Sequence, residues 1–348
     1  MSYEVLLMRR ALELAALGRA VDPNPRVGAV VTDLEGRVVG EGFHRGAGYP
    51  HAEVEALAAA GEHAAGGTAF VTLEPCDHEG RTGPCSEALL KARVVRVVYA
   101  QADPNPEAAG GAARLRAAGL VVDGGLLGTE ARGLNQAWTF AVTRGRPRVV
   151  WKFAATLDGR SGAADGTSQW ITGPAARADV HRWRGQAGAI LVGTGTVLAD
   201  DPGLTVRRPD GTLKEQQPLR VVVGRRGIAA KARVRNDAAP TLQVRERDPS
   251  RVLQLLADRG IRQVWLEGGP TLASAFLAAG LVDEVIAYLA PALLGSGRSA
   301  VADLGISTMA GILRLHPHEV TTLGSDIRIR ASIIDHQNEG TELACLPE

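Results

Sequence analysis

One histidine, one glutamate and two cysteines in the first quarter of the chain constrain the fold more than any other feature. His51 and Glu53 stand two positions apart, Cys76 directly follows a proline, and Cys85 comes nine positions later. Imidazole and thiolate groups are good ligands for zinc, and three protein ligands leave the fourth tetrahedral position open for water. The fold must therefore bring three separate segments to one metal ion, with a carboxylate beside it.

This set of residues suits hydrolytic deamination. Zinc lowers the pKa of a bound water toward neutrality, and a glutamate that reaches this water can carry its proton to a leaving nitrogen. Base-modifying zinc deaminases use the pattern H-x-E, followed by P-C and a second cysteine, with two residues between the cysteines. Here eight residues, DHEGRTGP, separate Cys76 from Cys85. Because this loop is rich in Gly, Pro and Asp, we expect it to fold back and return Cys85 to the metal.

A competing interpretation makes the two cysteines small core residues and His51 a surface histidine. The chain has three cysteines, and two of them fall within the pattern, which favours the metal site. The third, Cys345, lies in a polar tail and is assigned no role.

Charge and hydropathy limit the possible partners. The chain has 39 basic and 38 acidic residues, and a net charge of +1 offers no general attraction to nucleic acid. No stretch reaches the ~18 uninterrupted apolar residues of a membrane span, and no basic segment leads into an apolar run at the N-terminus. We therefore expect a cytoplasmic protein without a membrane partner, in agreement with its few cysteines. Lysine occurs only at positions 91, 152, 214 and 231, so Lys152 stands out among the many arginines.

Apolar periodicity predicts an α/β architecture in two domains. In the first domain, helices are expected over 4–19, 52–60, 85–91 and about 106–118, with strands over 27–32, 38–42, 69–73, 94–100 and 121–123. His51 and Glu53 then lie in the first turn of a helix, where the helix dipole favours an ionised carboxylate. After the sequence TRGRP a new strand begins at Arg148. The predicted domains are therefore 1–145 and 146–348.

The second domain again alternates strands and helices. Strands are expected over 148–154, 189–193, 219–223, 263–267 and 284–289, with helices over 252–259 and 271–279; segments 202–218 and 224–250 receive no element. Two strands run into Gly-rich turns, at 193–196 and 267–271, that can present backbone N–H groups to phosphate. Two such turns suit a dinucleotide. The alternative is a pair of tight connections that bind nothing, and the full G-x-G-x-x-G fingerprint is absent.

Several short segments, spread over both domains, share the pattern of one family. They are PNPRVG (23–28), PHAEV (50–54), TLEPC (72–76), GRT (80–82), PC (84–85), DPNP (103–106), SQWIT (168–172), TVLADDP (196–202), EGGPT (267–271) and LVDE (281–284). With them the chain resembles the bifunctional pyrimidine deaminase/reductase of riboflavin biosynthesis. In that family the long spacing between the zinc cysteines is normal.

The resemblance implies a cytidine-deaminase-like three-layer α/β domain followed by a dihydrofolate-reductase-like α/β domain. The first would hydrolyse the 2-amino group of 2,5-diamino-6-ribosylamino-4(3H)-pyrimidinone 5′-phosphate. Zinc would be bound by His51, Cys76 and Cys85, while Glu53 moves the proton and Asn24 orients the base. The second would use NADPH to reduce the ribosyl side chain of 5-amino-6-(5-phosphoribosylamino)uracil to ribityl.

By position, the resemblance also implies contacts in the reductase domain. Lys152 would lie near the ribose and polarise or protonate it. The implied cofactor contacts are Ala154, Trp170, Thr196, Asp200, Gly269, Pro270 and Thr271. The implied substrate contacts are Ser168, Arg184, Leu204, Arg207 and Glu267.

The chain departs from the family pattern at four positions. Asp77 stands where serine is usual and Gly83 where proline is usual, and neither is a ligand. Gly224 and Arg225 stand where the family carries an acidic residue and a serine beside the adenosine end of the cofactor. Our hypothesis is that Arg225 and Arg226 pair instead with the 2′-phosphate of NADP. An unchanged Michaelis constant for NADPH in Arg225→Ala would refute it.

Two other classes of protein share the zinc motif. A nucleic-acid base deaminase with an appended binding domain needs a basic surface and stacking aromatics, but charge is balanced here and aromatic residues make up 4%. Salt-dependent binding of tRNA or single-stranded DNA would identify it. A zinc-stabilised scaffold without activity would leave Glu53 without a purpose. The expected partner is a phosphorylated small-molecule pyrimidine, and we expect the chain to form a homo-oligomer.

Overall fold

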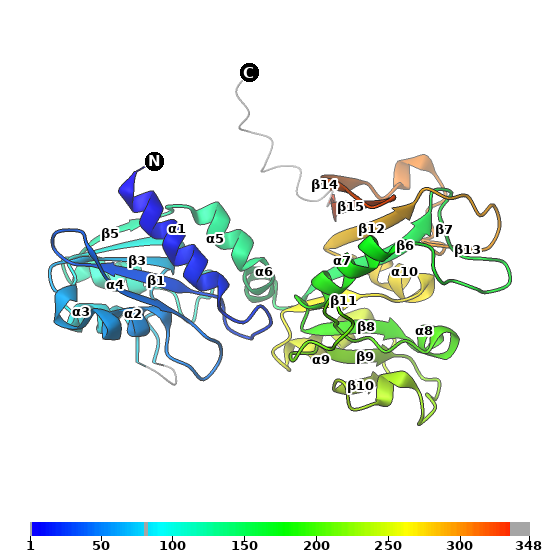
Figure 1. The fold of residues 1–348 in the computed structure, drawn as a ribbon, viewed down its shortest axis with the longest axis horizontal. Coiled ribbons are helices and arrows are strands. Elements are labelled where there is room, and N and C mark those ends of the chain that lie inside the picture. Colours follow the sequence, from blue (N-terminus) through cyan, green and yellow to red (C-terminus); the bar gives the residue numbers. More distant parts are fainter. Residues whose placement is uncertain (1, 80–82, 335–348) are drawn as a thin grey trace, which may run out of the picture. The chain divides into compact units, whose positions relative to one another are not determined.

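The computed structural model describes residues 2–79 and 83–334 and divides the chain into two compact units (Figure 1). Unit 1 comprises Met1–Arg146 and unit 2 comprises Pro147–Glu348, so the boundary falls one residue after the predicted one. Cys345 and the GRT segment at 80–82 lie outside the described residues. Within the described part of the chain, no helix combines the length and apolar character that crossing a membrane requires.

Unit 1 is built on one mixed sheet of five strands, in the order β2-β1-β3-β4-β5. Its strands are β1 (Gly28–Thr32), β2 (Val38–Phe43), β3 (Thr68–Leu73), β4 (Arg96–Gln101) and β5 (Val121–Gly124). Its helices are α1 (Tyr3–Ala16), α2 (Ala52–Ala60), α3 (Cys85–Lys91), α4 (Gly111–Ala117), α5 (Gly128–Leu134) and α6 (Gln136–Arg144). β1 pairs antiparallel with β2 and β3, whereas β3, β4 and β5 run parallel. Successive parallel strands need crossover helices, which explains the helical covering of the sheet.

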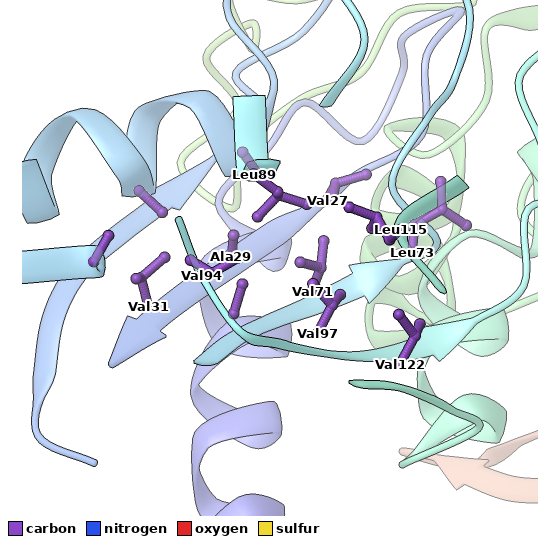
Figure 2. Packing of buried hydrophobic residues seen from close by; sticks show 14 of the residues in the cluster. Val27, Ala29, Val31, Val71, Leu73, Leu89, Val94, Val97, Leu115 and Val122 are labelled. Carbon is purple, nitrogen blue, oxygen red and sulfur yellow. The ribbon is translucent and has the colours of Figure 1, made fainter. Parts of the chain in front are cut away.

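Helices cover both faces of this sheet because alternate strand residues point to opposite sides. Ala29, Val31 and Val71 face α2, α3 and α4 (Figure 2), while Val30 and Phe70 face α1 and α5. The resulting three layers confirm the predicted architecture. α2 packs especially close to β2, since a Cβ atom at Gly42 would lie 2.5 Å from the Ala52 carbonyl oxygen. This close packing fixes the helix start that carries the predicted metal ligand.

Unit 2 is built on an eight-stranded sheet in the order β10-β9-β8-β11-β6-β12-β15-β14. Its strands are β6 (Arg148–Thr156), β8 (Ala189–Gly193), β9 (Leu219–Val223), β10 (Thr241–Val244), β11 (Gln263–Leu266), β12 (Glu284–Ala290), β14 (Leu315–Leu323) and β15 (Asp326–Ile333). β7 (Arg160–Gly162) and β13 (Arg298–Ser299) form a separate two-stranded sheet. The helices are α7 (Pro174–Arg184), α8 (Thr194–Asp200), α9 (Pro249–Ala257) and α10 (Pro270–Ala278). All pairings from β10 to β12 are parallel, and β15 and β14 add an antiparallel edge.

The sheet of unit 2 is also covered on both faces. Trp151 and Leu266 belong to the core under α9 and α10, whereas Ile190 and Trp265 belong to the core under α7 and α8. Strands buried on both faces read as continuous apolar runs, and VVW, AILV and VVV in β6, β8 and β9 have this composition. The carboxyl ends of β8 and β11 therefore lie along one edge of the sheet, where both Gly-rich turns follow, and Lys152 lies within β6, one position beyond the residue that pairs with Leu266 of β11.

Several boundaries differ from those predicted. The first helix ends at Ala16 rather than at 19, and the helix expected around 106–118 begins at Gly111. Helices α5, α6 and α7 were not predicted. Strand β10 lies inside a segment that received no element, and it forms by parallel pairing with β9. β14 and β15 were likewise not predicted; β15 forms by long-range pairing with β12, and β14 pairs in turn with β15.

Two candidate active sites and the family of the chain

The three predicted zinc ligands come together in unit 1. His51 occupies the N-cap position of α2, Cys76 follows β3, and Cys85 is the first residue of α3. Their ligand atoms all lie within 4.8 Å of one another, with His51 Nδ1 3.2 Å from Cys85 Sγ and 3.6 Å from Cys76 Sγ. Both cysteines are buried and neither forms a disulfide. One imidazole and two thiolates fit a zinc ion and leave one tetrahedral position for water.

Hydrogen bonds hold the ends of the long cysteine loop together. The Cys85 backbone N–H points to Cys76 Sγ at 3.4 Å, and the Ser86 N–H donates to the Cys76 carbonyl at 3.2 Å. Asp77, the residue that departs from the family pattern, accepts hydrogen bonds from Ser86 Oγ at 2.6 Å and from Arg114 Nη1 at 2.8 Å. The predicted return of Cys85 is therefore confirmed, and Asp77 supports it from the surface.

The ionisable side chains of this cluster shift one another's pKa values. Burial raises the pKa of the Glu53 carboxyl to about 7, and the nearby His51 opposes this rise. Hydrogen bonds from Cys85 and His51 outweigh burial and lower the pKa of the Cys76 thiol to about 4. The pKa of Cys85 is raised, first by its hydrogen bond with Cys76 and then by burial. One thiolate is thus stable even without a cation, and a metal ion would be needed for two.

His44 borders the zinc cluster and was not singled out by the sequence analysis. It is buried, its ring packs edge-on against His51 at 5.4 Å, and its Nε2 lies 3.1 Å from Asn24 Nδ2. Its Nδ1 lies 2.9 Å from the Pro50 carbonyl oxygen. Because a carbonyl can only accept, Nδ1 carries the proton, and Nε2 of the neutral ring accepts from the Asn24 amide. No sequence signal near His44 indicates this role.

Unit 2 gathers the second group of predicted residues around Glu267. This glutamate follows β11 and forms a two-pronged ion pair with Arg184 at the end of α7, with N···O distances of 2.9 and 2.5 Å. Trp265 Nε1 donates to the same carboxylate at 2.6 Å. Burial alone would raise the pKa of Glu267, but Arg184 and Lys152 lower it to about 2. Burial lowers the pKa of Lys152, and Glu267 opposes that shift.

Hydrogen bonds also join the predicted cofactor turns. The Gly269 N–H donates to Thr196 Oγ1 at 3.2 Å, which links the turn before α10 to the start of α8. Ser168 Oγ donates to Asp200 Oδ1 at 3.2 Å. The two Gly-rich turns are therefore neighbours at the same sheet edge, an arrangement that the sequence analysis did not predict.

The remaining predicted contact residues of unit 2 differ in their exposure and in their neighbours. Trp170 is 70% exposed, and the guanidinium of Arg177 stacks over its ring at 4.6 Å. Pro270 is the first residue of α10, Thr271 is exposed beside it, and Ala154 packs partly buried on β6. Leu204 is buried, and the backbone N–H of Arg207 points to His181 Nδ1 at 3.3 Å.

Gly224 has a structural reason to be glycine. Its φ is +135°, and a Cβ atom there would lie 2.6 Å from Thr194 Oγ1. A side chain at this position would be strained and would collide with the start of α8. Arg225 and Arg226 follow in exposed positions, and Arg226 Nη2 lies 3.0 Å from where a Gly195 Cβ would be. This guanidinium therefore borders the first Gly-rich turn.

Both halves of the chain match models of known families. Residues 1–101 match the cytidine and deoxycytidylate deaminase zinc-binding region, and residues 147–329 match the RibD C-terminal domain. The chain belongs to the RibD family. The RibD riboflavin biosynthesis protein of Mycobacterium tuberculosis is 54% identical over 88% of this chain and 90% of its own length, and that of Escherichia coli K12 is 43% identical over 92% and 96%.

Solved RibD structures share the fold. A RibD structure from Acinetobacter baumannii superimposes with a TM-score of 0.86 at 42% identity, covering 95% of this chain and 99% of that one. A deaminase/reductase from Thermotoga maritima reaches a TM-score of 0.85 at 34% identity with the same coverage. As a RibD protein the chain is an enzyme of riboflavin biosynthesis, with a zinc-binding deaminase domain and an NADPH-dependent reductase domain. These matches favour the enzyme over the nucleic-acid base deaminase and the inactive scaffold.

Proposed function

We propose that this chain catalyses two consecutive steps of riboflavin biosynthesis, with unit 1 as the deaminase and unit 2 as the reductase. Unit 1 would remove the 2-amino group of 2,5-diamino-6-ribosylamino-4(3H)-pyrimidinone 5′-phosphate. Unit 2 would reduce the ribosyl group of the deaminated product to ribityl. The observation that carries this proposal is the presence, in one chain, of the His51, Cys76 and Cys85 cluster beside buried Glu53 and of the Lys152, Arg184 and Glu267 cluster.

In unit 1, the polar side chains of the zinc cluster and its surroundings each have a task in the proposed hydrolysis. His51, Cys76 and Cys85 would hold zinc, which when bound supplies Lewis-acid activation of water. The Glu53 carboxylate would take a proton from the attacking water and deliver it to the leaving amino nitrogen. Because the Asn24 amide nitrogen donates to His44, the amide oxygen is the side-chain group of Asn24 that can accept from a ligand. That oxygen would accept a hydrogen bond from the pyrimidine and orient it.

In unit 2, reduction adds a hydride at C1 of the ribose and one proton. NADPH supplies the hydride when bound. The Lys152 ammonium, held near the Glu267 carboxylate, would hold and donate the proton next to the opened sugar. The proposed cofactor contacts are Ala154, Trp170, Thr196, Asp200, Gly269, Pro270 and Thr271, and the proposed substrate contacts are Ser168, Arg184, Leu204, Arg207 and Glu267. Hydrogen bonds from Gly269 to Thr196 and from Ser168 to Asp200 support this grouping.

The test follows the two steps separately. Zinc-loaded protein is incubated with the diaminopyrimidinone ribosyl phosphate, with and without NADPH, while ammonia and NADPH absorbance are recorded. We expect ammonia release without NADPH, and NADPH oxidation that begins only after the deaminated product accumulates. Release of ammonia without later NADPH oxidation would overturn the reductase assignment. Absence of both signals would overturn the assignment of the substrate.

We also propose that the enzyme is a cytoplasmic homo-oligomer that pairs through the β14 edge of unit 2. β14 is the terminal strand of the sheet, and Val320 on it is 65% exposed. Leu315 at the start of β14 is also exposed, and further exposed apolar side chains precede the strand in the chain, namely Leu293, Leu294, Val301, Ile306, Met309 and Ile312. An open edge strand is a template for pairing with another chain. Light scattering on Val320→Lys should report a smaller assembly than on the parent protein. The free thiols of Cys76 and Cys85 fit a reducing compartment.

A further inference from the structure

Arg220 is a fully buried arginine that no step of the proposed chemistry uses. It lies in β9 between β8 and β10, and its side chain is 0% exposed. Among residues 2–79 and 83–334 no carboxylate forms a salt bridge with it. Instead its guanidinium donates only to uncharged oxygens, those of Gly203, Arg233, Asn236 and Ala239. A buried charge without a counter-ion is costly, so its retention calls for a reason.

The acceptors of Arg220 belong to two loops that meet beside the reductase site. Nη1 donates to the Gly203 carbonyl at 3.3 Å, to the Arg233 carbonyl at 3.2 Å and to Asn236 Oδ1 at 2.8 Å. The same two loops are joined a second time, because the Arg233 N–H donates to Asp201 Oδ1 at 2.8 Å. Arg220 therefore fastens the loop that follows α8 to the segment before β10.

The loop after α8 has a strained backbone. Asp201 has φ +36° and Leu204 has φ +47°, and neither is glycine. A bulky residue in the left-handed region is a true outlier, and such strain persists only where the surroundings over-determine it. The carbonyl groups on either side of Leu204 are both bound by arginines: Gly203 O by Arg220 and Thr205 O by Arg184 Nη1 at 3.1 Å.

We propose that Arg220 is a positioning residue for reductase substrate binding, acting through the Leu204 loop. Arg184, a proposed substrate contact, donates to the Thr205 carbonyl of this loop and also pairs with Glu267. Arg220 holds it from inside the domain, so that Leu204 and Arg207 are presented in one fixed conformation before the substrate arrives. Preorganisation of this kind lowers the ordering cost of binding. The inference rests on the proposed substrate role of Leu204 and Arg207.

Arg220→Met in the full-length, zinc-loaded protein tests the proposal. Methionine fills much of the volume but donates no hydrogen bonds, so the loop is held from one side only. We expect the Michaelis constant for the deaminated ribosylamino substrate to rise at least tenfold, while that for NADPH and kcat change less than threefold. Arg235→Met is the matched control, because Arg235 is an exposed arginine of the same segment that contacts Gln243. Its constants should equal those of the parent protein.

Asn236→Ala provides a second, milder variant. It removes one acceptor of Arg220 and should raise the same Michaelis constant several-fold without affecting NADPH binding. The circular dichroism spectrum shows that each variant is folded, and ammonia release by unit 1, which does not contain the substitution, should be unchanged. Unchanged substrate constants in both folded variants, or an equal loss of substrate and NADPH affinity, would overturn the positioning role. A parent protein without reductase activity on this substrate would overturn the proposed function instead.

Discussion

Replacement of Glu284 by glutamine tests the ionic core of the reductase domain. Glu284 lies in β12 and is 0% exposed. One carboxylate oxygen pairs with Arg148 of β6, and the other accepts from Arg330 Nε of β15 at 2.7 Å. Because β12 lies between β6 and β15 in the sheet, a single carboxylate neutralises one arginine from each neighbouring strand.

The expected loss of unfolding free energy depends on which partners Arg148 and Arg330 retain in the variant. Glutamine preserves the shape of the side chain but removes the charge. Arg330 keeps its ion pair with Glu319 at 2.8 Å, whereas Arg148, 9% exposed, keeps a hydrogen bond to the neutral Gln263 at 3.2 Å. Breaking a buried ion pair by removing one partner costs about 3–5 kcal/mol. Because one arginine stays paired, we expect the lower end, about 3 kcal/mol of unfolding free energy.

Urea unfolding followed by tryptophan fluorescence measures this loss. Four of the five tryptophans, at positions 151, 170, 183 and 265, belong to unit 2, so the signal reports mainly on the affected domain. Arg251→Gln is the control, because Arg251 is 75% exposed in its ion pairs with Glu246 and Asp248. Such a surface pair contributes about 0–1 kcal/mol. A Glu284→Gln protein as stable as this control would refute the reasoning.

The same variant has a pH signature. Burial would raise the pKa of Glu284, but Arg148 and Arg330 outweigh it and hold the pKa below its ordinary value of 4.5. A carboxyl whose pKa is lowered by folding stabilises the protein above the ordinary value and loses this contribution as the pH falls through the folded value. The difference between the parent protein and Glu284→Gln should therefore shrink from neutral toward acid pH. A difference that grows on acidification would contradict the ion-pair origin.

Three further predictions concern the two sites. Glu53→Gln should lower the rate of ammonia release at least ~10²-fold while zinc content and reduction of the deaminated substrate persist, and simultaneous loss of zinc would point to a structural role instead. Glu267→Gln removes the neighbour that raises the pKa of Lys152, so the alkaline limb of the reductase pH profile should move to lower pH; an unmoved limb would exclude Lys152 as the proton donor. Arg225→Ala should raise the Michaelis constant for NADPH but not for NADH, because the guanidinium would pair with the 2′-phosphate, and equal effects on both cofactors would reject that pairing.

The sequence by itself determined the chemistry of the deaminase site and the general architecture. Zinc ligation requires specific residue types, which made His51, Cys76 and Cys85 recognisable. The turn-forming residues between the two cysteines predicted that the loop folds back and brings Cys85 to the metal site. The apolar runs of β6, β8, β9 and β11 were likewise readable, since strands buried on both faces leave a continuous hydrophobic pattern. The two Gly-rich turns were predicted as separate phosphate-binding turns, and the hydrogen bond from Gly269 to Thr196 shows that they are neighbours.

Tertiary structure alone decided the features that depend on distant partners. β10 and the β14–β15 hairpin received no strand prediction, although Ile and Arg alternate in β15, and they join the sheet by pairing with β9 and β12. His44 and Arg220 look like any histidine and arginine in the sequence, and only the fold places one on Asn24 and the other beneath Leu204. Residue type and periodicity are local properties that a sequence records directly. Which carbonyl a buried side chain meets depends on how separate segments pack, and that is fixed only when the chain folds.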